Sequence, residues 1–185
     1  MATTTSNPAA LSTWKLDPAH SSAEFKVKHM MISNVKGSFH SLSGTLTEHP
    51  TDKTLSSIDA TIDVSSITTC NAERDAHLKS ADFLDVARYP AMTFSSSKVQ
   101  PNGDSGYYVT GDLTIHGETH QQTFVVEGPT APGKDPSGNT RIGLSATTRI
   151  NRKDYGLSWN AALETGGILV GDDVNITIEA QFLKT

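Results

Sequence analysis

The sequence predicts an all-β protein, an eight-stranded antiparallel barrel with one short helix between strands. Ser, Thr and β-branched residues are frequent, and the chain lacks the richness in Ala, Leu, Glu and Lys that is typical of helical proteins. Eight segments alternate between apolar and polar residues, which is the pattern of half-buried strands. With 185 residues the chain has the size of one domain. Eight strands can close into a barrel without exposed edges, although a two-sheet sandwich fits the same pattern.

The first twelve residues predict a disordered tail, and the barrel domain is expected to span 13–185. Small polar residues and alanine dominate the tail, and they offer little apolar surface to offset the entropy of ordering. The tail has neither the basic nor the apolar stretch of a secretory signal, and the chain has no run of about 18 apolar residues. We therefore expect a cytoplasmic protein without stable membrane insertion, or a periplasmic one if a signal was removed.

Four strands are predicted in the N-terminal half of the domain. The first is expected at 22–29, where alternate residues share one face: Ala23, Phe25, Val27 and His29. The second is expected at 35–48, with a β-bulge where the alternation changes phase after Phe39. Residues 55–64 and 91–99 predict the third and fourth strands, and a short additional strand can form at 13–16.

One helix is expected between the third and fourth strands, from Ala72 to about Ser80. Asn71 precedes it and can accept a hydrogen bond from a free main-chain N–H of the first turn. The last four strands are expected at 107–115, 119–127, 141–150 and 174–182. The first two of these are joined by a short link containing Gly117, which is typical of a hairpin.

The residues expected to face inward differ widely in size. Bulky and small side chains mix along the same faces: Phe25, Phe39 and Phe94 with Ala23, Gly37, Ala60, Gly111 and Ala146. An eight-stranded barrel has room for packed side chains or for one small ligand. Strands of nine to twelve residues are about 30 to 40 Å long at about 3.3 Å per residue. The pattern fits both an elongated apolar cavity and a solid core in which large and small side chains interdigitate.

Charge and motif content favour a binding protein over an enzyme. Because the net charge is −5, nucleic acid and an anionic membrane surface are not expected as partners. A negative net charge is still compatible with local basic patches. Cys70 is the single cysteine, expected to be at least half-buried, and it excludes an intrachain disulfide. His116 and His120 flank a hairpin turn rather than sharing a helix face, so no metal site is expected. The chain lacks a GxSxG elbow, a phosphate-binding GxxxxGK[ST] loop and a GxGxxG turn.

Five spaced motifs carry information beyond strand patterning. A DxxHSxxxFxVxH segment runs from Asp17 to His29, and a VxGxF segment follows at 35–39. An RxxHLxSxDF segment at 74–83 precedes the pair Tyr89 and Pro90. The last two are GxLTxxGxT at 111–119 and RxDYG at 152–156. In this order they resemble the YceI-like family, also described as the polyisoprenoid-binding, lipocalin-like family, over residues 14–182.

The resemblance implies a lipocalin-like barrel around a long apolar tunnel that holds an isoprenoid or fatty-acid-type lipid. No cofactor is required, and the expected partner is a long-chain lipid such as a polyisoprenoid quinone or a prenyl phosphate. Strand parity, loop position and the family motifs together select the expected ligand-binding residues: Phe25, Val27, His29, Met31, Phe39, Ile62, Phe94, Leu113, Leu144, Arg152 and Trp159. A long tail in a dry tunnel gains about 0.8 kcal/mol per buried methylene.

Two departures from the family pattern and two alternative functions accompany this expectation. Leu84 stands where a second Phe is usual, and Tyr155 replaces the commoner Phe. One alternative is an enzyme or stress-response factor acting on a lipophilic substrate, with His29, His77 or Arg152 as acid-base or phosphate-binding groups. The other is a filled barrel that works through its surface, for example as a homodimer.

Overall fold

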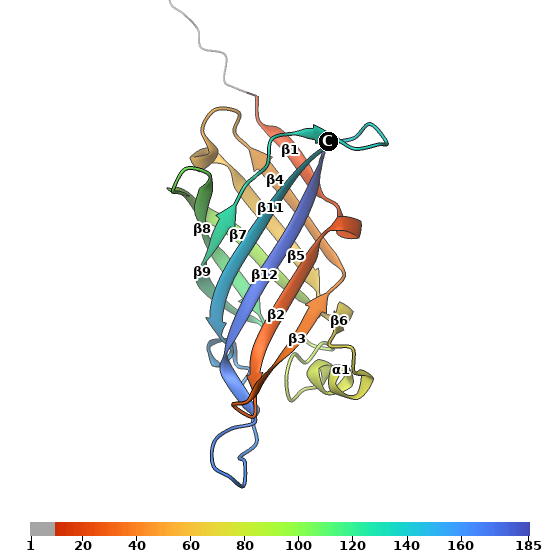
Figure 1. Ribbon diagram of the computed structural model, residues 1–185, viewed down its shortest axis with the longest axis vertical. Coiled ribbons are helices and arrows are strands. Elements are labelled where there is room, and N and C mark those ends of the chain that lie inside the picture. Colours follow the sequence, from red (N-terminus) through yellow and green to blue (C-terminus); the bar gives the residue numbers. More distant parts are fainter. Residues whose placement is uncertain (1–9) are drawn as a thin grey trace, which may run out of the picture.

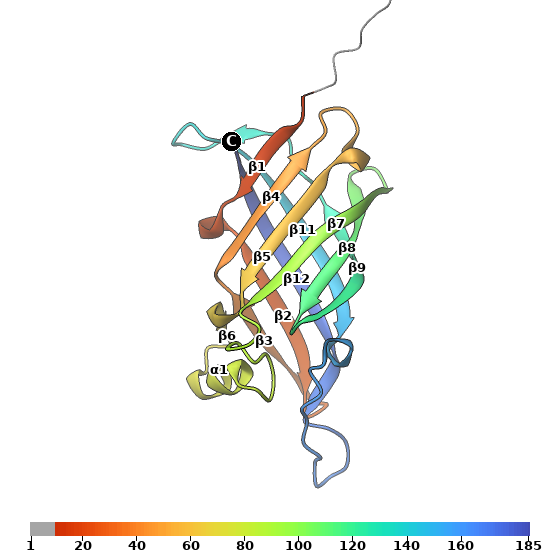
Figure 2. The same ribbon diagram turned by 180° about the vertical axis from the view of Figure 1, so that it is seen from behind.

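The computed structural model describes residues 10–185 as a tapered antiparallel β-barrel with a short helix at one end (Figures 1 and 2). The strands are β1 (Ser12–Leu16), β2 (Ser22–His29), β3 (Ser33–Phe39), β4 (Leu42–Glu48), β5 (Ser57–Asp63), β6 (Ile67–Thr68), β7 (Ala91–Asn102), β8 (Gly106–Ile115), β9 (Glu118–Glu127), β10 (Gly133–Lys134), β11 (Thr140–Asn151) and β12 (Val170–Lys184). The α-helix is α1 (Ala72–Lys79), and the 3-10 helices are η1 (Pro18–His20), η2 (Lys53–Leu55), η3 (Val64–Ser66) and η4 (Arg152–Tyr155).

These strands occupy eight positions around the barrel, as the sequence predicts. Three positions hold two short strands in succession: β1 with β2, β3 with β4, and β5 with β6. The other five positions hold β7, β8, β9 with the two-residue β10 after it, β11 and β12, and the long β11–β12 pairing closes the ring. The eight predicted segments coincide with these positions, and the short strand expected at 13–16 is β1.

The phase change after Phe39 is a break between two strands rather than the predicted β-bulge. β3 pairs with β2 and β6, whereas β4 pairs with β1 and β5. Ser66 Oγ, from η3 in the adjacent position, accepts hydrogen bonds from the main-chain N–H groups of His40 at 3.2 Å and Ser41 at 3.1 Å. A side chain therefore satisfies the donors that the interrupted ladder leaves free.

The predicted helix and hairpin turn are both confirmed. Asn71 caps α1, since its Oδ1 accepts a hydrogen bond from the N–H of Arg74 at 2.9 Å. His116 and Gly117 both have positive φ, which is the backbone geometry of a tight hairpin turn. Cys70 is exposed, so the expectation of an at least half-buried side chain is wrong. Of the predicted tail, residues 1–9 lie outside the described part of the chain, and Ser12 already begins β1.

The core consists of inward-facing side chains arranged in two clusters along the barrel. The larger cluster extends from Phe39 and Leu42 to Tyr155 and Leu157. The smaller one surrounds Trp14 on β1, a strand that lies at the barrel end that carries the C-terminus (Figure 1). Within residues 10–185, none of the helices is long and apolar enough to cross a membrane.

Candidate ligand-binding site

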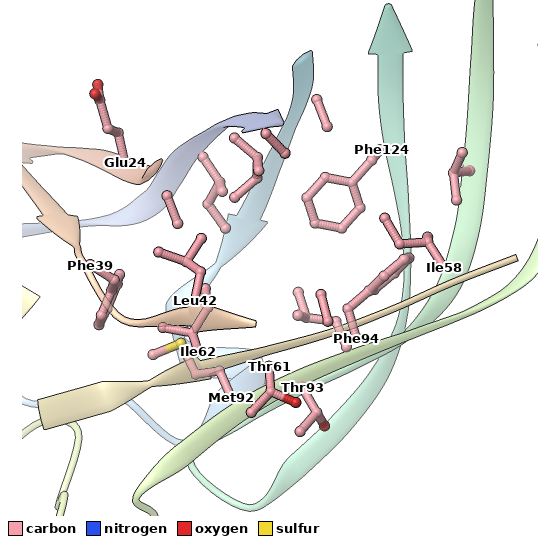
Figure 3. A pocket seen from close by; sticks show the side chains of 18 of the residues that line it. Glu24, Phe39, Leu42, Ile58, Thr61, Ile62, Met92, Thr93, Phe94 and Phe124 are labelled. Atoms are coloured by element: carbon pink, nitrogen blue, oxygen red, sulfur yellow. The ribbon is translucent and has the colours of Figure 1, made fainter. Parts of the chain in front are cut away.

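An apolar cavity of about 300 Å³ occupies the interior of the barrel (Figure 3). All eight barrel positions contribute to its wall, and α1 and the segments after it add residues at one end. Phe94 and Phe124 face this space in Figure 3, whereas Glu24 points away from it. The cavity therefore lies within the ring of strands.

The exposed fractions of the inward-facing residues show that the barrel is hollow rather than filled. Several apolar residues pack against the buried core yet remain only partly buried: Phe25, Ile58, Ile62, Met92, Phe94, Val99, Leu144, Val174, Ile176 and Ile178. They face the interior, so the surface they retain is cavity wall. A core packed to the usual interior density would leave little of this surface accessible. Of the two readings that the sequence permits, the structure confirms the cavity.

Small residues in the wall make room for the aromatic rings beside them. A Cβ atom at Gly37 would lie 2.3 Å from Cζ of Phe25, and one at Gly111 would lie 2.3 Å from the main-chain oxygen of Ser95 and 2.8 Å from Cζ of Phe94. The Phe25 and Phe39 rings contact each other at a tilt of 48°, with a centroid distance of 5.9 Å. The uneven size of the inward residues thus fixes where the rings lie and leaves the remaining space open.

The segment that follows α1 closes one end of the cavity. Leu78 on the helix and Phe83 and Leu84 after it line the wall at this end. Phe83 and His77 lie against the indole ring of Trp159, with centroid distances of 5.0 and 4.8 Å. An aromatic cluster therefore joins the α1 segment to the loop that precedes β12.

Arg152 is a cation at this apolar end, only 3 % exposed. Its guanidinium donates hydrogen bonds to the main-chain oxygens of Gly171 at 2.8 Å, of Trp159 at 2.9 Å and of Leu157. Burial lowers the pKa of Arg152, and the Asp172 carboxylate at 3.6 Å opposes that shift. Arg152 lies in the cavity wall, and its hydrogen bonds tie the start of β12 to the loop that precedes it.

A small polar group lies in the cavity wall near η2. Glu48 accepts hydrogen bonds from the indole Nε1 of Trp14 at 2.9 Å and from Lys53 Nζ at 2.6 Å. The Glu48 side chain is 13 % exposed, so this ion pair is largely shielded from solvent. Ser56 and Ser57 also line the cavity here. Along the β4–β5 pair, these polar side chains lie at the end of the cavity that is remote from α1.

Eight of the eleven predicted ligand-binding residues lie in the cavity wall: Phe25, Val27, Phe39, Ile62, Phe94, Leu113, Leu144 and Arg152. The other three lie elsewhere. Met31 is 63 % exposed in the β2–β3 turn, and His29 occupies the last position of β2, beyond the wall. Trp159 packs behind Phe83 rather than facing the cavity. Strand alternation does not extend to Met31 in a turn or to Trp159 in a loop, whereas His29 keeps the alternation but lies at the end of β2, beyond the cavity.

Sequence reasoning missed two groups of wall residues. Val174, Ile176 and Ile178 share a face of the last predicted strand, so their alternation was a usable signal. Phe83 and Leu84 lie in turns after α1, where no periodic pattern marks a buried face. Only the folding of this segment over the barrel end brings them to the cavity.

The two histidines of the β8–β9 hairpin face η4 rather than each other. His120 Nε2 lies 2.7 Å from the main-chain oxygen of Asp154, and His116 Nδ1 lies 3.2 Å from that of Tyr155. Both imidazoles therefore tie the hairpin to η4. Among residues 10–185, no group of three or more His, Cys, Asp or Glu side chains is arranged to hold a metal ion.

The closed antiparallel ring and its apolar interior define a lipocalin-like β-barrel. The chain belongs to the YceI-like family, because the model of the YceI-like domain matches residues 14–182. A UPF0312 protein of Staphylococcus aureus is 40 % identical over 172 residues, covering 93 % of this chain and 98 % of the relative. A UPF0312 protein of Staphylococcus epidermidis is 40 % identical over 169 residues, covering 91 % and 96 %.

Solved structures share the fold. BcnA of Burkholderia cenocepacia has a TM-score of 0.76 at 25 % identity, covering 90 % of this chain and 98 % of BcnA. The YCEI protein of Campylobacter jejuni has a TM-score of 0.71 at 32 % identity, covering 86 % and 91 %. A domain from Saccharophagus degradans, described as a polyisoprenoid binding domain, has a TM-score of 0.64 at 18 % identity, covering 93 % and 98 %.

Proposed function

We propose that this protein binds a long-chain amphiphilic lipid, of the polyisoprenoid quinone or prenyl phosphate class, and carries it unchanged. The observation that carries the proposal is the hollow barrel itself, whose wall is built almost wholly from aliphatic and aromatic side chains. A lipid tail has the shape and the polarity for such a space. The Saccharophagus degradans domain of the same fold, described as polyisoprenoid binding, supports this ligand class.

The energetics of this binding depend on the tail. Each methylene that leaves water for the cavity contributes about 0.8 kcal/mol. A polar head group gains little from the apolar wall, because burial without hydrogen-bonding partners costs free energy. We therefore expect affinity to rise with tail length until the cavity is filled and to vary less with head-group chemistry.

Organic extraction of the purified protein, followed by mass spectrometry, tests the proposal. Native mass spectrometry of the intact complex counts the bound molecules, and the delipidated protein is then titrated with isoprenoid quinones of increasing tail length. We expect one bound lipid per barrel and tighter binding of the longer tails. A protein that purifies empty and also takes up neither quinones nor prenyl phosphates would overturn the proposal.

A further inference from the structure

The turn between β2 and β3 exposes three consecutive apolar side chains. Met30 is 42 % exposed, Met31 63 % and Ile32 78 %. The turn lies at the end of the barrel that also carries α1 and the loop before β12 (Figures 1 and 2). Single exposed apolar residues are common on protein surfaces, but three in a row at the tip of this hairpin form a continuous apolar patch. The loop before β12 extends farther from the barrel than this tip (Figures 1 and 2).

The backbone of this turn presents the three apolar side chains at the end of the hairpin. Met30 and Met31 adopt φ values of 52° and 61°, the geometry of a tight hairpin turn, which glycine and asparagine adopt most readily. Two methionines occupy these positions instead, and their side chains are exposed rather than packed into the core.

Three exposed lysines flank the tip on the outer face of the same hairpin. Lys26 lies directly opposite Lys36 in the β2–β3 ladder, and Lys28 lies opposite Asn34. Like charges directly opposite each other destabilise a sheet. Within residues 10–185, none of the three lysines forms an ion pair with an acidic side chain.

Most of the acidic groups near this face are paired with cations. On β12, the strand next to β2, Asp172 pairs with Lys153 at 2.9 Å and Asp173 pairs with Arg149. Glu24 is the acidic residue on the outer face of β2, and it lies toward the end of the strand remote from the tip. The β2–β3 hairpin therefore carries three lysines against one glutamate, Glu24, while Glu164 lies in the neighbouring loop before β12 and the whole chain carries −5.

The tip is connected to the end of the cavity. Met30 donates a main-chain hydrogen bond to the oxygen of Leu169 at 2.7 Å, which ties the turn to the loop before β12. Val27 and Val170, each within three residues of that bond, line the cavity. A surface that contacts the tip is therefore close to the end of the apolar interior.

We propose that Met30, Met31 and Ile32, with Lys26, Lys28 and Lys36, form a docking surface for an anionic lipid bilayer. The apolar tip enters the headgroup region, and the lysines pair with the phosphates around it. This combination of an apolar point and a basic collar complements the surface of a membrane that contains acidic phospholipids. The protein then stands end-on, with the cavity end that lies behind the tip held against the bilayer.

Vesicle flotation tests the docking surface. The vesicles contain equal parts of phosphatidylglycerol and phosphatidylcholine, with pure phosphatidylcholine vesicles for comparison. We expect binding to the anionic vesicles only, weakening as salt is added. Lys26→Gln with Lys36→Gln should lower the affinity about 25-fold, since each lysine near such a surface contributes about fivefold. Met31→Ser with Ile32→Ser should lower it at least about tenfold.

Matched controls use residues at other places on the barrel. Leu55 in η2 is 63 % exposed, as Met31 is, and Lys98 is an exposed lysine on β7. Leu55→Ser and Lys98→Gln should leave vesicle binding unchanged. Circular dichroism confirms the fold of each variant, and native mass spectrometry measures its lipid load without vesicles. The load is expected to stay unchanged in all of them, which separates this surface from the proposed cavity function.

Two results would overturn the docking surface. One is wild-type protein that does not bind the anionic vesicles, or that binds them equally well after the hairpin substitutions. The other is concentration-dependent dimerisation, seen by analytical ultracentrifugation, that Met31→Ser with Ile32→Ser abolishes while vesicle binding is absent. The tip would then contact a second copy of the chain.

Discussion

Replacing Ala60 by phenylalanine should close the cavity without weakening the fold. Ala60 lies on β5, opposite Gly44 on one side and Phe94 on the other, and it lines the cavity. A Phe side chain at this position extends into open space beside the Phe94 ring. In a filled core the same change would cost about 1–3 kcal/mol through overpacking. In a hollow barrel the free energy of unfolding should stay equal or rise.

The effect on ligand binding follows from the space that the new ring occupies. If the ring displaces four methylenes of a bound tail, the loss is about 3.2 kcal/mol at about 0.8 kcal/mol each. That loss corresponds to roughly 200-fold weaker binding. Titration of the delipidated protein with an isoprenoid quinone measures the change, and urea unfolding measures the stability.

Val125→Phe is the matched control, because Val125 on β9 is 41 % exposed and is not one of the residues that line the cavity. This variant should keep both its affinity and its stability close to those of the wild type. A folded Ala60→Phe protein that binds the quinone as tightly as the wild type would refute the reasoning. A loss of 1–3 kcal/mol in stability, the usual cost of overpacking, would also refute it.

Three other perturbations probe the wall, the surface and the core. Leu113→Asp places a charge in the dry cavity wall, so it should abolish lipid retention and lower the free energy of unfolding; a folded variant with normal retention would contradict the assignment. Hydrogen bonds from Arg141 are the largest cause that lowers the pKa of Asp17 and of Asp135 to about 2, below the usual 3.8, so this clamp stabilises the fold above about pH 4 and is lost as the pH falls toward 2. Arg141→Met should flatten the stability profile over that pH range in acid titrations of unfolding, and an unchanged profile would exclude the clamp. The buried Tyr155 hydroxyl has no hydrogen-bond partner within residues 10–185, so Tyr155→Phe should leave the midpoint of thermal unfolding equal or higher, and a lower midpoint would reveal a partner.

The cavity-wall residues that the sequence predicts correctly lie inside strands, where apolar and polar side chains alternate. Phe25, Val27 and Leu113 lie inside long strands, where every second side chain faces the same side, and they line the cavity as expected. Met31 and Trp159 lie in segments without a period, and neither lines the cavity. Parity is a property of the strand backbone, so it gives no information one residue beyond the strand.

The break after Phe39 illustrates a second limit. A bulge and a strand break shift the phase of alternation in the same way along the sequence. They differ in which neighbours pair with the residues on either side, and pairing partners here come from distant parts of the chain. β4 pairs with β1 and β5 while β3 pairs with β2 and β6, which the local pattern of 35–48 does not encode.

The sequence alone determines the eight strand segments, the capped helix and the family, because alternation, capping and motif spacing are local or ordered along the chain. The tertiary structure decides whether the interior is hollow. The same mixture of large and small side chains can fill a narrow barrel or line a wide one. The width of the barrel depends on the number of strands and on their stagger, and the stagger is fixed only when the ring closes. The fold also brings Phe83 from a turn to the cavity wall, which no local pattern encodes.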